Sequence, residues 1–253
     1  MNKDHSIDVL ELPNYQLANL KTFSLNAFMQ KGETEVAQLN LNFGVIFNDF
    51  KDMLWFLDLI VPSLQRERQK VGPNTKNAKL GQLCGMQQHC QRILAGCAWE
   101  FIQTIEKNMT VIRSPEFDTL VQCSDKNVYK AWGEIIDTIY NKRDLYKTLV
   151  EIRNNANYHY YNTNYASKGI DHYRSRIDDI GFISLGTNPE ETRFYFAEAA
   201  LQFYYIQASA KYAQMQDFAE QFNDFVTKSM LCLRFIINKW FITYPQITLN
   251  DYI

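Results

Sequence analysis

The segment from 152 to 161 gathers side chains that suit acid–base and phosphate chemistry. Its ten residues include one arginine, one histidine, three asparagines and three tyrosines, in the order Ile152, Arg153, Asn154, Asn155, Ala156, Asn157, Tyr158, His159, Tyr160 and Tyr161. Arginine keeps its charge and can grip a phosphate with a fork of donors, whereas histidine titrates near neutral pH and can accept or give a proton. Together they suit cleavage of a phosphodiester.

The order of the charged and polar residues carries a resemblance. Arg153 is followed directly by Asn154 and, six positions after the arginine, by His159. This resembles the Arg-polar-x-His signature of the HEPN superfamily, helical domains many of which are metal-independent ribonucleases. A second similarity covers positions 91–100, where an apolar Leu-Ala-Gly segment precedes Glu100 as in the second helix of such proteins.

The resemblance implies a role for each residue of the motif. Arg153 would stabilise charge on the phosphate, Asn154 would orient the arginine or the phosphate, and His159 would act as general acid or base. The neighbouring side chains, Asn157, Tyr158 and Tyr160, would contact the RNA, the tyrosines by stacking on bases. Some toxins of the superfamily carry adenylate, attached by an antitoxin, on the tyrosine of a His-x-Tyr extension, and Tyr161 occupies that place. The other interpretation makes His159 a hydrogen-bonded core residue and the tyrosines a packed aromatic stripe.

The spacing of the motif needs a structural explanation. On an ideal helix Arg153 and His159 lie about 120° apart and do not share a face. Either the asparagine-rich segment distorts the helix, because asparagine is a poor interior helix former, or the two side chains converge from neighbouring subunits. The resemblance implies the second solution, a homodimer with two copies of the motif around one groove.

Composition favours long helices in a soluble protein. The chain has 253 residues, 46% of them hydrophobic, with 17 Phe and 15 Tyr against only 10 Gly and 6 Pro. Five irregularly spaced cysteines and no recognisable signal peptide predict a reducing cytoplasm. No apolar run is long enough to predict a membrane span. A zinc site from Cys84, His89, Cys90 and Cys97 is disfavoured, because the spacing matches no familiar ligand pattern.

The formal charge of −2 argues against tight coating of nucleic acid, so any RNA contact should be local. Basic residues gather between 66 and 79, where Glu67 is the one acid; they are Arg66, Arg68, Lys70, Lys76 and Lys79. This stretch is either an RNA-contacting loop or an ordinary solvated one.

Periodicity predicts one all-α domain over 1–253. The resemblance implies that it is a HEPN-like helical bundle with additional helices. Its parts are an N-terminal arm at 1–14, helices near 15–30 and 34–60, a HEPN-like core at 77–165 that contains the motif helix, a small β-hairpin or extended excursion at 180–196, and a long C-terminal helix at 198–242, as one helix or two closely joined ones. Glycine at position 44 is a possible interruption of the second helix, and proline at 62, beyond its predicted end, marks a kink or the start of a further turn.

The resemblance implies a metal-independent endoribonuclease that acts as a toxin or antiphage defence effector and is held inactive by a partner or signal. It needs no cofactor and no metal, because the nucleophile is the 2′-hydroxyl of the RNA itself. Its expected partners are RNA, a second copy of the chain and an antitoxin or activating partner, with no membrane. The alternative is a non-catalytic helical interaction or regulatory module, and a DNA-binding regulator is disfavoured by the acidic balance.

Overall fold

The structure is a computed structural model that describes residues 21–24, 34–70, 77–122, 125–156, 192–200, 215–243 and 250–251, with single positions at 171, 183 and 189. Most of these residues are helical, which confirms the all-α class for the described part of the chain. The elements are β1 (Lys21–Thr22), α2 (Glu35–Lys70), α3 (Ala78–Lys107), α4 (Met109–Ile112), α5 (Pro115–Gln122), α6 (Lys126–Tyr140), α7 (Asp144–Ala156), α10 (Met215–Thr243) and β2 (Asn250–Asp251).

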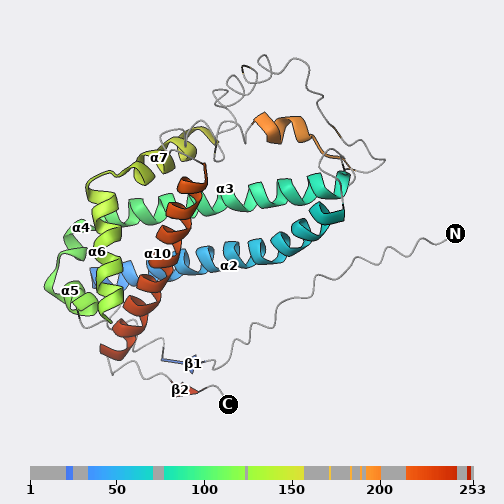
Figure 1. The fold of residues 1–253 in the computed structure, drawn as a ribbon. Coiled ribbons are helices and arrows are strands. Elements are labelled where there is room, and N and C mark those ends of the chain that lie inside the picture. Colours follow the sequence, from blue (N-terminus) through green and yellow to red (C-terminus); the bar gives the residue numbers. More distant parts are fainter. Residues whose placement is uncertain are drawn as a thin grey trace.

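Two long antiparallel helices, α2 and α3, form the base on which the others pack (Figure 1). The prediction of a helix at 77–109 is confirmed to within two residues. Asn77 caps α3, because its side-chain oxygen accepts hydrogen bonds from the backbone N–H groups of Lys79 at 2.8 Å and Leu80 at 3.3 Å. At the end of α2, Glu67 is paired with Lys70 at 3.1 Å and with Lys79 at 3.4 Å, which links the two helices.

Helix α2 is longer than the sequence predicts. It passes position 44 without interruption and continues through Pro62 to Lys70, so the predicted end near residue 60 is wrong. A proline inside a helix removes one hydrogen bond and costs roughly 3 kcal/mol. Ile60 and Leu64 are buried on either side of Pro62, while Pro62 itself is exposed. Burial of the apolar face of α2 therefore offsets the free-energy cost of the proline. On the exposed side, water can bind the backbone oxygen that lost its hydrogen bond.

The many aromatic residues join the helices at one core. Phe43 of α2 lies 6.1 Å from Phe101 of α3 and 6.3 Å from Trp132 of α6, measured between ring centres. Phe101 in turn lies 6.1 Å from Phe225 of α10. The phenylalanines at 43 and 101 are fully buried, and the same cluster reaches α7 through Leu149. One hydrophobic core thus holds the described helices together.

The short helices begin where the sequence places their caps. Ser114 accepts a hydrogen bond from the backbone N–H of Phe117 at 3.3 Å, at the start of α5. Asp125 accepts one from the N–H of Asn127 at 2.7 Å, at the start of α6. Both side chains satisfy a backbone N–H that the first turn of a helix leaves unpaired.

The predicted helix at 15–30 is wrong where the structure describes it. Lys21 and Thr22 form β1, which pairs antiparallel with β2, opposite Asp251 and Asn250. The phenylalanine that follows β1, Phe23, lies 5.4 Å from Phe241 of α10 between ring centres. Pairing with a distant segment and packing on α10 override a helical pattern that short-range spacing alone suggested. The predicted arm at 1–14 lies outside the described residues.

The region between α7 and α10 is described only in part. Within the predicted hairpin at 180–196, residue 193 makes an isolated bridge and a helix covers 195–200, so the second limb is helical from its third residue. The predicted C-terminal helix at 198–242 is confirmed as α10 over 215–243, and 201–214 lie outside the described residues. We call residues 192–200 the docked segment, because they lie against α3 (orange in Figure 1). None of the described helices combines the length and apolar character that a membrane crossing requires.

Candidate functional site

Helix α7 carries the first half of the motif and is anchored on its inner face. Leu145, Leu149 and Ile152 recur at helical spacing and are buried against the core. Tyr146 packs edge-on against Trp99 of α3, with ring centres 5.5 Å apart. These contacts fix the axis and the rotation of the helix that ends with the motif arginine.

A polar contact adds to this anchor. The hydroxyl of Tyr146 donates a hydrogen bond to Glu106 of α3 at 3.0 Å, and Gln103 donates to the same carboxylate at 2.6 Å. Burial, then the hydrogen bond and the negative charge of Glu106, raise the pKa of Tyr146. The phenol therefore stays protonated and keeps donating over the physiological pH range.

Arg153 lies in the last turn of α7, half-buried, and Asn154 beside it is exposed. A guanidinium nitrogen of Arg153 donates to the side-chain oxygen of Asn154 at 3.2 Å. The guanidinium of Arg153 thus lies in the last described turn of α7 and is half-buried. The role of Asn154, to orient the arginine or the phosphate, stays a prediction.

The second half of the motif lies outside the described residues. It comprises Asn157, Tyr158, His159, Tyr160 and Tyr161. Their predicted roles remain predictions, as does the choice between a distorted helix and a dimeric site. The structure therefore brings together only the arginine and the first asparagine of the motif.

One face of α3 holds a group of polar residues that the sequence analysis did not connect. Gly81, Gly85, His89 and Arg92 recur at intervals of four and three, which places them on one side of the helix. A guanidinium nitrogen of Arg92 and Nδ1 of His89 are 3.2 Å apart. The docked segment covers the start of this face, because its side chains lie against Gly81 and Gly85. Trp99 and Glu106 lie further along the same face and contact Tyr146, so α7 covers the far end.

The docked segment is held by an ion pair and by close approach to the glycines. Arg193 makes two hydrogen bonds to the carboxylate of Glu198, at 2.5 and 3.1 Å, and a third to Gln82 at 2.8 Å. A β-carbon at position 85 would overlap the Arg193–Glu198 pair, so a glycine is needed for this approach. The glycine spacing in the sequence predicted close packing, although not its partner.

His89 is kept neutral by its surroundings. Burial and then the positive charges of Arg92 and Arg193 lower the pKa of His89, while Glu198 opposes them. A neutral imidazole has one nitrogen that can accept a proton or a hydrogen bond. Because an arginine can only donate, Nδ1 of His89 is the nitrogen that accepts from Arg92, and the other ring nitrogen carries the proton and can donate a hydrogen bond.

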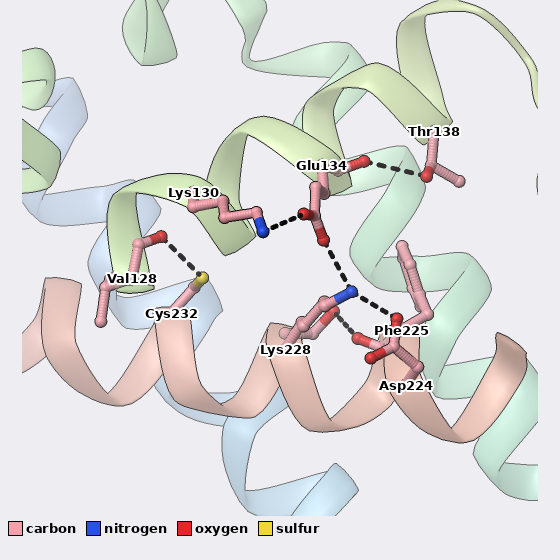
Figure 2. Close-up of polar contacts among 9 residues, drawn as sticks. Val128, Lys130, Glu134, Thr138, Asp224, Phe225, Lys228 and Cys232 are labelled. Atoms are coloured by element: carbon pink, nitrogen blue, oxygen red, sulfur yellow. Dashed lines mark hydrogen bonds and ion pairs between the residues drawn. The ribbon is translucent and has the colours of Figure 1, made fainter. Parts of the chain in front are cut away.

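A shallow groove of about 680 Å³ lies between α6, the start of α7 and α10. Figure 2 shows its charged wall, in which Lys228 of α10 reaches Glu134 of α6 at 2.6 Å and Asp224 at 2.5 Å. These partners raise the pKa of Lys228, first through the Asp224 hydrogen bond. Because the lysine charge is already neutralised by two carboxylates, the contact serves to join α6 and α10.

Burial raises the pKa of the thiols of Cys90, Cys97 and Cys232. Burial, followed by the nearby charge of Asp49, raises the pKa of Cys97 to about 11, and burial alone raises that of Cys232 to about 12. A thiol with a raised pKa is a poor nucleophile. Among the described residues, no three histidine, cysteine or acidic side chains are grouped closely enough to hold a metal ion.

Comparison of the chain with protein-family models, curated proteins and solved structures found no match. The function is therefore argued from the residues and their arrangement.

Proposed function

We propose that the chain is a metal-independent endoribonuclease of the HEPN type. The observation that carries the proposal is Arg153, directly followed by Asn154 and then by His159, at the end of a helix fixed in an all-α core. The hydrogen bond between Arg153 and Asn154 supports the pairing that the HEPN signature implies. The fold class is compatible with such a domain.

In the proposed reaction the 2′-hydroxyl of the RNA attacks the adjacent phosphorus. His159 takes the proton of that hydroxyl or gives one to the departing 5′-oxygen, and the products are a 2′,3′-cyclic phosphate and a 5′-hydroxyl end. Arg153 stabilises the charge on the non-bridging oxygens of the transition state. A homodimer would bring two copies of the motif around one groove, and activity would be restrained in the cell by an antitoxin or released by a signal.

The test is cleavage of a mixed RNA pool in EDTA by the purified protein, with the product ends mapped. Arg153→Ala and His159→Ala should each abolish cleavage, while Arg234→Ala, which removes an exposed arginine of α10, should leave it intact. Equal activity in the motif variants and the wild type would refute the site. Loss of activity in EDTA that Mg²⁺ restores would refute the metal-independent mechanism.

A second candidate is a non-catalytic helical interaction module. The observation that favours it is an exposed apolar stripe on one face of α10, formed by Leu231, Phe235 and Ile242. Growth on expression separates the two candidates. A nuclease should arrest growth in a manner that His159→Ala relieves, whereas an interaction module should be equally tolerated with and without that histidine.

A further inference from the structure

The docked segment presents two aromatic rings to solvent. Its side chains alternate, since Arg193 and Tyr195 contact α3 whereas Phe194 and Phe196 are 53% and 48% exposed. The two exposed rings are 6.2 Å apart and nearly perpendicular, at 79°. Exposing two adjacent phenylalanines costs hydrophobic free energy, so these rings are candidates for contact with a ligand.

The segment beneath these rings is fixed in place. The hydroxyl of Tyr195 donates to the backbone oxygen of Ala78 at 3.0 Å, and its ring lies where a β-carbon at position 81 would be. Arg193 is bound by Glu198 and by Gln82 of α3. The outward rings are therefore held on a rigid support, which lowers the entropy cost of binding to them.

The rings stand at the basic end of the molecule. Ala78, which binds Tyr195, precedes Lys79, and Lys79 shares Glu67 with Lys70. Arg66 and Arg68 are exposed on the same last turns of α2. Figure 1 shows the docked segment (orange) beside the N-terminal end of α3, where α2 also ends. The described parts of 63–82 thus carry four basic residues against one acid at the end of the molecule where the docked segment lies.

We propose that this end of the molecule binds single-stranded RNA, with bases stacked on Phe194 and Phe196 and phosphates bound by Arg66, Arg68, Lys70 and Lys79. Aromatic platforms beside basic side chains are the usual means of holding single strands, because every base has a stacking face and every nucleotide a negative charge. The choice of RNA rests on the proposed nuclease function. The surface would hold the strand that extends from the cleavage site.

The position of α7 supports a continuous path. Helix α7 packs along α3 (Figure 1). The C-terminal end of α7 is directed toward the N-terminal half of α3, where the docked segment lies. Along the shared face of α3, His89 and Arg92 stand between the positions that contact the docked segment and Trp99, which contacts α7. A strand bound at the rings could therefore continue past these polar side chains toward Arg153.

The experiment measures binding of full-length protein to a fluorescent 2′-O-methyl oligouridine by anisotropy. This probe lacks the attacking hydroxyl, so binding is measured even if no cleavage occurs, and failure of this proposal is distinguishable from failure of the nuclease proposal. Removing both rings with Phe194→Ala and Phe196→Ala should weaken binding about 5- to 100-fold for each ring. The matched control is Phe56→Ala, an exposed ring in the middle of α2, which should leave affinity unchanged.

Salt dependence tests the charged half of the surface. Replacing Arg66 and Arg68 with glutamine should reduce the slope of log affinity against log salt by about 1.4, since each phosphate contact on a single strand contributes roughly 0.7. Lys126→Gln with Arg234→Gln removes two exposed charges elsewhere and should not change the slope. The proposal would be overturned if the two-ring variant bound the oligonucleotide with wild-type affinity. It would also be overturned if the folded wild type did not bind at low salt, and a protein would then be the remaining partner for the two rings.

Discussion

Replacing Tyr146 with phenylalanine removes only the hydroxyl that fastens α7 to α3. The lost contact is the 3.0 Å hydrogen bond to Glu106, while the ring keeps its packing on Trp99. A hydrogen bond to a charged group contributes roughly 1.5–3 kcal/mol when it is well shielded. Glu106 is only half-buried and also binds Gln103, so solvent and this second donor reduce the value to about 1 kcal/mol.

The assay is urea unfolding of four proteins in a double-mutant cycle. Tyr146→Phe and Glu106→Ala are measured singly and together, and their coupling free energy should be about 1 kcal/mol. In a chain of this size that loss corresponds to a fall of roughly 2–4 °C in Tm. Tyr129→Phe, which alters an exposed tyrosine of α6, is the matched control and should have no effect.

The pH dependence of this contact has a defined sign. The folded-state pKa of Tyr146 is raised, so its contribution to stability is complete below the ordinary tyrosine pKa and is lost as the pH rises through the folded-state value. Tyr146→Phe should therefore remove part of the fall in unfolding free energy at alkaline pH. A coupling free energy near zero, with an unchanged alkaline profile, would refute the conclusion that this bond positions the motif helix.

Three further changes test the packing and the helix junction, each by urea unfolding. Leu149→Ala removes a fully buried side chain of α7 and should cost about 2–5 kcal/mol, against much less for half-buried Val150→Ala; equal costs would contradict the assigned inner face. Asn40 is buried in α2, and neither atom of its amide has a hydrogen-bond partner among the described residues, so near-isosteric Asn40→Leu should stabilise the fold by about 1 kcal/mol or more; destabilisation would indicate a partner for the amide. The pKa of Glu67 is lowered, chiefly by its hydrogen bond from Lys70, so its contribution is complete at neutral pH and is lost as the pH falls through the folded-state value; Glu67→Gln should flatten the acid limb of the stability profile, and an unchanged limb would contradict the pairing.

Much of the fold follows from local features of the sequence. The caps Asn77, Ser114 and Asp125 set the start of α3, α5 and α6, because each supplies an oxygen to backbone N–H groups that a helix leaves unpaired. The apolar spacing of Leu145 and Leu149 predicts the buried face of α7 correctly. These signals act within a few residues, so the sequence alone contains them.

Other parts of the fold depend on contacts between distant residues. The strand at Lys21 and Thr22 exists through pairing with 250–251, and α2 passes Pro62 because burial outweighs a local penalty. Neither effect is visible in a short window of sequence, where the first segment has a helical pattern and the proline predicts an end.

The candidate site divides in the same way. The sequence by itself determined the candidate motif, since Arg153, Asn154 and His159 are recognised by residue type and spacing. Only the tertiary structure brought Phe194, Phe196 and the basic end of α2 together, because the docked segment reaches α3 through contacts with residues more than a hundred positions away, such as Arg193 with Gln82 and Tyr195 with Ala78. Local propensity decides what a segment can form, whereas burial and side-chain pairing across the chain decide which surfaces meet.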